Sequence, residues 1–108
     1  KNQLQSEIRA SKRILEEKLG HTVDIFCWVG GEELSYSGQG AQTIREATYK
    51  YSFMTNCMPI TVHTSPLQLQ RNNVETSWPI NLVKFALSGV MDLLYMPKRK
   101  RVNKLTSK

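Results

Sequence analysis

Apolar residues recur with a helical period at the start of the chain. Over residues 3–19 they return every three or four positions, and charged side chains occupy the remaining face of the helix. The apolar positions are Leu4, Ile8, Ile14, Leu15 and Leu19. Gly20 follows directly, and glycine suits the left-handed conformation in which many helices end. The pattern predicts an amphipathic helix over residues 3–19.

A strand, a helix and a second strand are predicted next. Residues 23–28 are rich in β-branched and aromatic side chains, which is typical of a strand buried on both faces. A glycine-containing loop leads to a short helical pattern over residues 41–50, and residues 51–55 then alternate like a strand. This order predicts a βαβ unit with parallel strands and a right-handed crossover.

The rest of the chain is less regular. Residues 60–63 and 67–70 form two short extended candidates. A helical pattern then begins near residue 77 and continues to residue 95. Its apolar side chains cover more than one stripe, so this helix needs covering on several sides.

These elements make an incomplete sheet. A parallel sheet needs both faces covered and its edges closed or protected. Three helices and two to four short strands do not achieve this. The sequence therefore predicts an α/β fold in which residues 1–96 form part of a distorted (β/α) barrel, about half of it, and residues 97–108 form a basic tail.

Length bounds the class of protein. The chain has 108 residues, enough for one domain. It contains no apolar run of the roughly 18 residues that span a membrane. The polar N-terminus is not typical of a signal peptide. Because the first residue is Lys1, we expect a processed product, an excised segment or a fragment of a longer protein.

The net charge of +6 resides in the last residues. Fifteen Lys and Arg oppose nine Asp and Glu, and six of the cations follow Pro97, where no acid occurs. A nucleic-acid-binding surface would instead spread its basic residues over the fold, so no specific nucleic acid partner is expected. Such a run is expected to be a solvated tail or to pack against a missing part. A phosphate-bearing surface is the alternative partner.

Cysteine and histidine form no recognisable metal motif. Cys27 and Cys57 lack a C-x-x-C spacing, so we expect two free thiols, as in a reducing compartment. His21 and His63 are 42 positions apart, which matches no local ligand spacing. His21 follows a helix end and is expected at the surface, and His63 is expected in a strand. No metal ligand is predicted in this chain.

The loop after the first predicted strand is the candidate ligand groove. The carboxyl ends of parallel strands are where α/β proteins build their sites. Aromatic side chains beside a glycine-rich backbone suit stacking against sugar rings, although a buried tryptophan and a simple strand end are the alternatives. An arginine further along is expected to hold an anionic group or to pair with Glu75. The candidate groove residues are Trp28, Gly30, Gly31, Tyr36 and Arg71.

Glu32 and Glu33 lie in the same loop. Adjacent carboxylates are able to bind a cation or a sugar hydroxyl, and a solvated loop is the alternative. No glycine-rich phosphate loop, nucleophile elbow or H-E-x-x-H motif is present.

Three stretches resemble the second half of the polysaccharide deacetylases. The first, residues 7–31, is similar to a helix of the type L-E-E-x-L-G that leads into a strand V-x-x-F. The second, residues 49–56, resembles a G-Y-x-x-A-F-T-T segment. The third, residues 69–74, is similar to a closing L-x-R-x-x-V strand. Together they cover residues 5–76 in order, and Val29 stands where the family has proline.

The resemblance implies a distorted (β/α) barrel that removes N- or O-acetyl groups from sugars, a hydrolase acting on C–N bonds other than peptide bonds in the first case. It implies a divalent metal, usually zinc, bound by one Asp and two His, with a neighbouring Asp as base. Those ligands belong to an Asp-Asp and a His-x-x-x-His motif, which this chain lacks. We therefore expect no catalytic residue in this chain, and we expect it to be inactive alone.

The implied partners are an acetylated oligosaccharide or polysaccharide and an N-terminal segment or companion chain that carries the metal. A non-catalytic carbohydrate-binding or structural module is one alternative. A membrane-surface protein, bound through its apolar helix and basic tail, is another. Free thiols favour the cytoplasm, whereas related enzymes are often exported to the cell envelope.

Overall fold

A three-stranded parallel sheet lies at the centre of the computed structural model, which describes residues 2–30 and 32–107. The strand order is β1-β2-β3, and both neighbouring pairs are parallel. In the first pair Ile25 lies opposite Tyr51, and in the second Phe53 lies opposite Leu69. The strands are β1 (Ile25–Cys27), β2 (Tyr51–Met54) and β3 (Leu69–Gln70). The predicted α/β class and the parallel β1-α2-β2 unit are confirmed.

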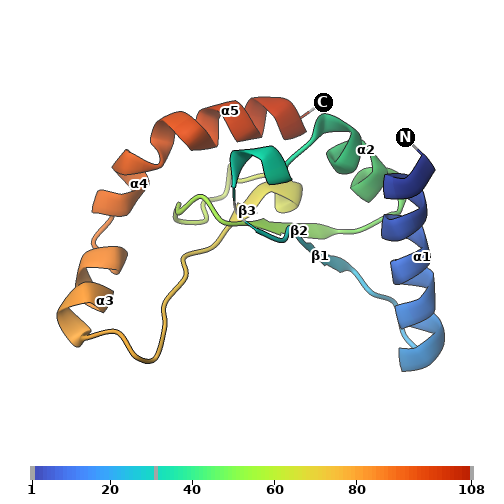
Figure 1. Ribbon diagram of the computed structural model, residues 1–108, viewed down its shortest axis with the longest axis horizontal. Coiled ribbons are helices and arrows are strands. Elements are labelled where there is room, and N and C mark those ends of the chain that lie inside the picture. The colour runs from blue at the N-terminus through green and yellow to red at the C-terminus, as the bar shows by residue number, and fades with distance from the viewer. Residues whose placement is uncertain (1, 31, 108) are drawn as a thin grey trace.

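Some helices lie over one face of this sheet, and others extend away from it (Figure 1). They are α1 (Asn2–Leu19), α2 (Gly38–Glu46), α3 (Ile80–Leu87), α4 (Val90–Leu94) and α5 (Met96–Thr106), with short 3₁₀ turns η1 (Glu33–Ser35) and η2 (Pro66–Gln68). The first helix matches its predicted bounds closely, and Gly20 has the expected positive φ of 72°. No helix in the described part of the chain is long and apolar enough to cross a bilayer.

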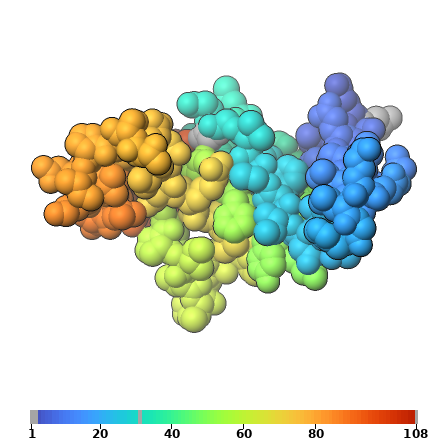
Figure 2. All heavy atoms as spheres, turned by 90° about the horizontal axis from the view of Figure 1, so that it is seen from below, coloured from blue at the N-terminus to red at the C-terminus, as the bar shows by residue number. Residues whose placement is uncertain are grey.

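The sheet is covered on one face. Figure 1 shows α2 and α5 above the strands, with no helix below them. Along β2 the side chains alternate accordingly, because Ser52 and Met54 are buried while Tyr51 is exposed. Strand β1 was predicted to be buried on both faces, and this is wrong. Ile25 and Cys27 are exposed because no element packs on the open face, which Figure 2 shows from below.

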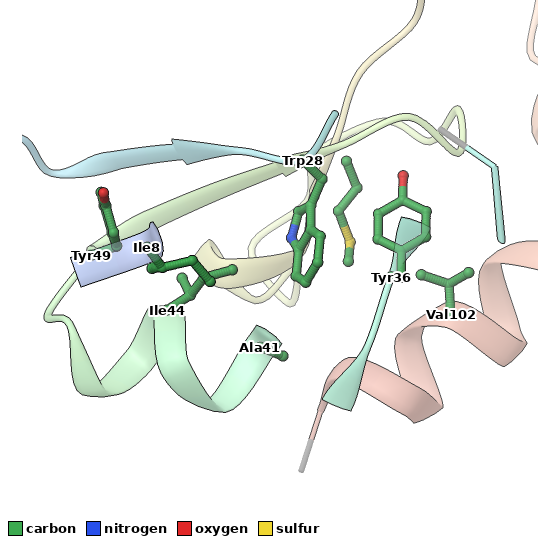
Figure 3. Close-up of a cluster of buried hydrophobic side chains, with 8 residues drawn as sticks. Ile8, Trp28, Tyr36, Ala41, Ile44, Tyr49 and Val102 are labelled. Carbon is green, nitrogen blue, oxygen red and sulfur yellow. The ribbon is translucent and has the colours of Figure 1, made fainter. Parts of the chain in front are cut away.

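The core lies between the sheet and α2 (Figure 3). Its members are aromatic and aliphatic side chains from several elements, namely Ile8, Trp28, Tyr36, Ala41, Ile44, Tyr49, Met54 and Val102. Phe26 joins this cluster through edge-on contacts with two other rings. The centre of its ring lies 5.6 Å from that of Trp28 and 5.5 Å from that of Tyr49. Such aromatic contacts fix the rings more specifically than burial alone.

Helix α2 begins three residues earlier and ends four residues earlier than predicted. The Oγ atom of Ser37 accepts a hydrogen bond from the backbone N–H of Gly40 at 3.0 Å, which caps the helix despite its two glycines. Thr48 has a φ of 61°, a left-handed conformation that stops the helix before residue 50.

Two predicted elements differ after β2. Residues 60–63 are not a strand, because Thr61 and Thr64 hydrogen-bond to each other across a turn that includes His63. The single helix predicted over residues 77–95 is two helices, α3 and α4. The chain breaks at Gly89, whose φ of 86° is left-handed. Both helices project from the body (Figure 1).

The basic segment after Pro97 is a helix that packs on the body. Helix α5 places Val102 in the core, fully buried, and it lies against α2. The Arg45 guanidinium donates to the carbonyl oxygen of Thr106 at 2.6 Å, and the Gln68 amide donates to the carbonyl oxygen of Asn103 at 3.0 Å. A solvated tail is therefore not what this segment forms.

Candidate functional site

A pocket lies at the carboxyl edge of the parallel sheet. Gly30, Thr55 and Arg71 line it, and each follows the end of a different strand. Parallel strands bring these positions together because their carboxyl ends meet at one edge. The pocket has a volume of about 480 Å³, within the usual range for small-ligand sites. We call it the strand-end pocket.

The opposite wall of the strand-end pocket is apolar and aromatic. It comes from α3, α4, the start of α5 and the residues next to these helices. It includes Phe85 of α3, Trp78 just before α3, and Tyr95 between α4 and α5. Lys98 lines the pocket on the first turn of α5, with its Nζ atom 5.6 Å from the centre of the Tyr95 ring. The pocket thus combines ring surfaces with polar strand-end groups.

Two arginines of α5 fasten this wall to the sheet. Arg99 Nη1 donates to the carbonyl oxygen of Cys57 at 2.6 Å and to that of Asp92 at 3.2 Å. Arg101 forms two hydrogen bonds with the carboxylate of Glu33, at 2.7 and 2.8 Å. Because Cys57 follows β2 and Glu33 follows β1, the helix is tied to two loops at the carboxyl edge.

Trp28 and Tyr36 are core residues and not walls of the groove. Both are buried, and their ring centres lie 5.3 Å apart (Figure 3). The Tyr36 hydroxyl nevertheless contacts Thr55, which lines the pocket. The backbone N–H of Thr55 donates to it at 3.1 Å, and the two hydroxyl oxygens lie 3.0 Å apart. Tyr36 therefore positions a pocket residue without lining the pocket.

Gly30 and Arg71, two of the candidate groove residues, both line the strand-end pocket. Gly30 has a φ of 97°, which favours glycine and lets the backbone turn away from β1. The predicted Gly31 lies outside the described residues. Of the predicted groove residues that are described, two line the pocket and two are buried in the core.

The adjacent carboxylates of Glu32 and Glu33 do not share one site. Glu32 lines the strand-end pocket, whereas Glu33 points to α5 and pairs with Arg101. The hydrogen bonds from Arg101 hold the pKa of Glu33 below its ordinary value of 4.5. Glu33 is therefore a charged structural partner, and it is not paired with its neighbour in one site.

Cys57 lines the pocket as a free thiol. Burial, followed by the nearby charge of Asp92, raises its pKa above the ordinary value of 9.0. The protonated thiol predominates at neutral pH, and it is a weak nucleophile. The other cysteine, Cys27, is also free and is exposed.

No group of three or more His, Cys, Asp or Glu in residues 2–30 and 32–107 is placed to hold a metal ion. His21 is exposed beyond the end of α1, and its Nδ1 atom lies 3.0 Å from the carbonyl oxygen of Thr22. His63 is exposed in the turn after β2.

Several pocket residues were not predicted from the sequence. Thr55 is the last residue of the strand predicted over residues 51–55, and it could have been found by that position at the strand's carboxyl end. No such signal marked the residues of the aromatic wall, because they are 24 to 44 positions away from Met54 along the chain; they are Trp78, Phe85, Tyr95 and Lys98.

Comparisons with protein-family models, curated proteins and solved structures find no match to this chain.

Proposed function

We propose that this chain is the C-terminal portion of a polysaccharide deacetylase-like hydrolase, which removes acetyl groups from sugars. The observation that supports this is a parallel sheet covered on one face, with a pocket at the carboxyl edge of its strands. In a (β/α) barrel the helices lie outside the strands, and the active site is built at their carboxyl ends.

The open face of the sheet fits a section of barrel wall. It carries the exposed apolar side chains of Ile25 and Tyr51, which a parallel sheet normally buries. In the proposed enzyme, strands of a further segment continue the sheet and these side chains point into the barrel. The resemblance of residues 5–76 to the deacetylase pattern adds to this argument.

The pocket has the chemistry of a sugar site. The Trp78 and Tyr95 rings offer apolar surface to the C–H face of a pyranose, and the Thr55 hydroxyl offers a hydrogen bond to its oxygens. Tyr36 holds Thr55 in place by hydrogen bonds to its backbone N–H and its hydroxyl. In this proposal the chain binds and orients the saccharide.

The metal of such an enzyme would polarise the acetyl carbonyl and lower the pKa of a bound water. The described residues do not fit this ion, because they contain no cluster of three or more ligand side chains. The two aspartates, Asp24 and Asp92, are 68 positions apart and form no Asp-Asp motif. We therefore assign no metal-dependent reaction step to the residues of this chain. The proposal places the ligands in a different segment.

Native mass spectrometry and an acetate-release assay on the natively purified protein test the proposal. We expect a metal and a segment with the Asp-Asp and His-x-x-x-His motifs, in the same or a companion chain. We expect acetate release from chitotetraose or acetylated xylan, lost on chelation and restored by zinc. A lone 12.4 kDa species that binds these sugars but releases no acetate would overturn the proposal of a deacetylase, and it would support a carbohydrate-binding module instead.

A further inference from the structure

We propose that the acetylated saccharide held in the strand-end pocket carries a negative charge, and that Arg71 binds it. This inference rests on the proposed function and adds a class of substrate to it. Three features carry it: an arginine whose side chain has no partner among the described residues, a second cation in the same pocket, and an aromatic wall beside them.

Arg71 is held by its backbone, and its side chain is unpaired within the part of the chain that the structure describes. Its N–H donates to the carbonyl oxygen of Met54 at 3.0 Å, so the residue extends the sheet by one position. In residues 2–30 and 32–107 its guanidinium forms no ion pair or side-chain hydrogen bond. The expected pairing with Glu75 does not occur, since that carboxylate accepts from Asn73 at 3.3 Å.

The charges that line the pocket favour an anion. Arg71 and Lys98 contribute two positive charges, and Glu32 contributes one negative charge. Lys98 comes from α5 and Arg71 from the end of β3, so the two cations enter from different elements. A cleft lined by an excess of one sign concentrates ligands of the opposite sign.

The shape of the groups indicates what the anion is. A guanidinium presents a planar fork of N–H donors that matches a carboxylate or a sulfate ester. The aromatic side chains beside it suit a sugar ring. A uronic acid or a sulfated sugar satisfies both features, whereas a neutral acetylated sugar leaves Arg71 without a partner.

The test is calorimetric titration of the natively purified protein with three saccharides that share N-acetylglucosamine. Chitotetraose is neutral, a hyaluronan tetrasaccharide adds carboxylates, and a keratan sulfate tetrasaccharide adds sulfates. We expect at least one charged saccharide to bind about tenfold more tightly than chitotetraose, as charge-assisted hydrogen bonds imply. The stronger of the two identifies the anion.

Variants assign the effect to the pocket. Arg71→Gln should lower the affinity for the charged saccharide much more than the affinity for chitotetraose, which removes the preference, and Arg71→Lys should restore part of that preference. Arg13→Gln is the matched control, since it changes an exposed arginine on α1 that pairs with Glu17. Circular dichroism melting curves would verify that each variant is folded.

The outcomes separate this inference from the proposed function. Equal affinity for neutral and charged saccharides, or a preference that survives in Arg71→Gln, would overturn the inference. Acetate release from chitotetraose in that case would leave the deacetylase proposal standing. If none of the three saccharides binds and no acetate is released, both proposals are wrong.

Discussion

Gly40 shows how closely α2 approaches the aromatic core. A Cβ atom at this position would lie 2.8 Å from Cη2 of Trp28 and 2.9 Å from the Oγ atom of the capping Ser37. The indole cannot move away easily, because Phe26 and Tyr36 contact it. Glycine is thus required here by packing, although it weakens a helix in isolation.

We predict that Gly40→Ala lowers the stability of the fold. Alanine gains up to about 1 kcal/mol in helix propensity, but overpacking a fixed core costs roughly 1–3 kcal/mol. Urea unfolding should therefore show a net loss of about 1 kcal/mol. Gln42→Ala, at an exposed position of the same helix, is the control and should stay within about 0.5 kcal/mol of the parent. A Gly40→Ala protein as stable as the parent would contradict the packing argument.

At the scale of elements, Glu16 joins α1 to the segment that leads into β1. Its carboxylate accepts hydrogen bonds from the backbone N–H of Val23 at 2.9 Å, and it pairs with Lys12 at 3.2 Å. Lys12 in turn donates to the carbonyl oxygen of Val23 at 2.7 Å. The backbone hydrogen bond, followed by Lys12, holds the pKa of Glu16 below its ordinary value of 4.5.

This lowered pKa predicts a loss of stability in acid. A carboxyl group with a lower pKa in the folded state binds fewer protons there than in the unfolded state, so stability rises with pH. The contribution is present above pH 4.5 and is lost as the pH falls from there through the lowered pKa. Thermal unfolding at several pH values should show a shallower acid decline in Glu16→Gln. Glu33 titrates in the same direction, so some decline remains.

Glu17→Gln is the control for this prediction. Glu17 is the next residue on α1, and it pairs only with the exposed Arg13 among the described residues. Its variant should keep the parent's dependence of the melting temperature on pH. An unchanged acid decline in Glu16→Gln would mean that the link between α1 and β1 does not contribute to stability.

Over the whole molecule, the arm formed by α3 and α4 makes the shape extended. The radius of gyration is 15.4 Å, whereas a compact chain of about 100 residues has roughly 13 Å. Neither helix of the arm contains a buried residue, and Leu93 and Leu94 are about two-thirds exposed. Tertiary packing supplies most of the stability of short helices, so the arm is the weakest part of the fold.

We predict that the arm exchanges its amide hydrogens much faster than the core. In hydrogen exchange measured by mass spectrometry, peptides from α3 and α4 should exchange at least about tenfold faster than those from α2, because they open locally. Helix α5, with Val102 buried, is the internal control and should exchange more slowly than the arm. Equal protection of arm and core would mean that another chain or a second copy covers the arm in solution.

The features that were predicted correctly depend on local patterns. A helical period followed by Gly20 defined α1, and alternation defined β2. The short spacing of strand, helix and strand required parallel pairing of β1 and β2. Each of these depends on residues within about 30 positions, because side-chain periodicity is a property of a single element and a βαβ unit joins neighbouring elements.

Only the tertiary structure decided what the basic segment and the groove candidates do. Arg99 and Arg101 look like a solvated tail in the sequence, yet they meet Cys57 and Glu33, which are 42 and 68 positions away. The sequence left Trp28 as either a sugar platform or a buried core residue, and the structure buries it against α2. The pocket brings together residues from Gly30 to Lys98. Residues so far apart in the sequence meet because distant surfaces of the chain bury one another. The local hydrophobic pattern does not determine which surfaces do so.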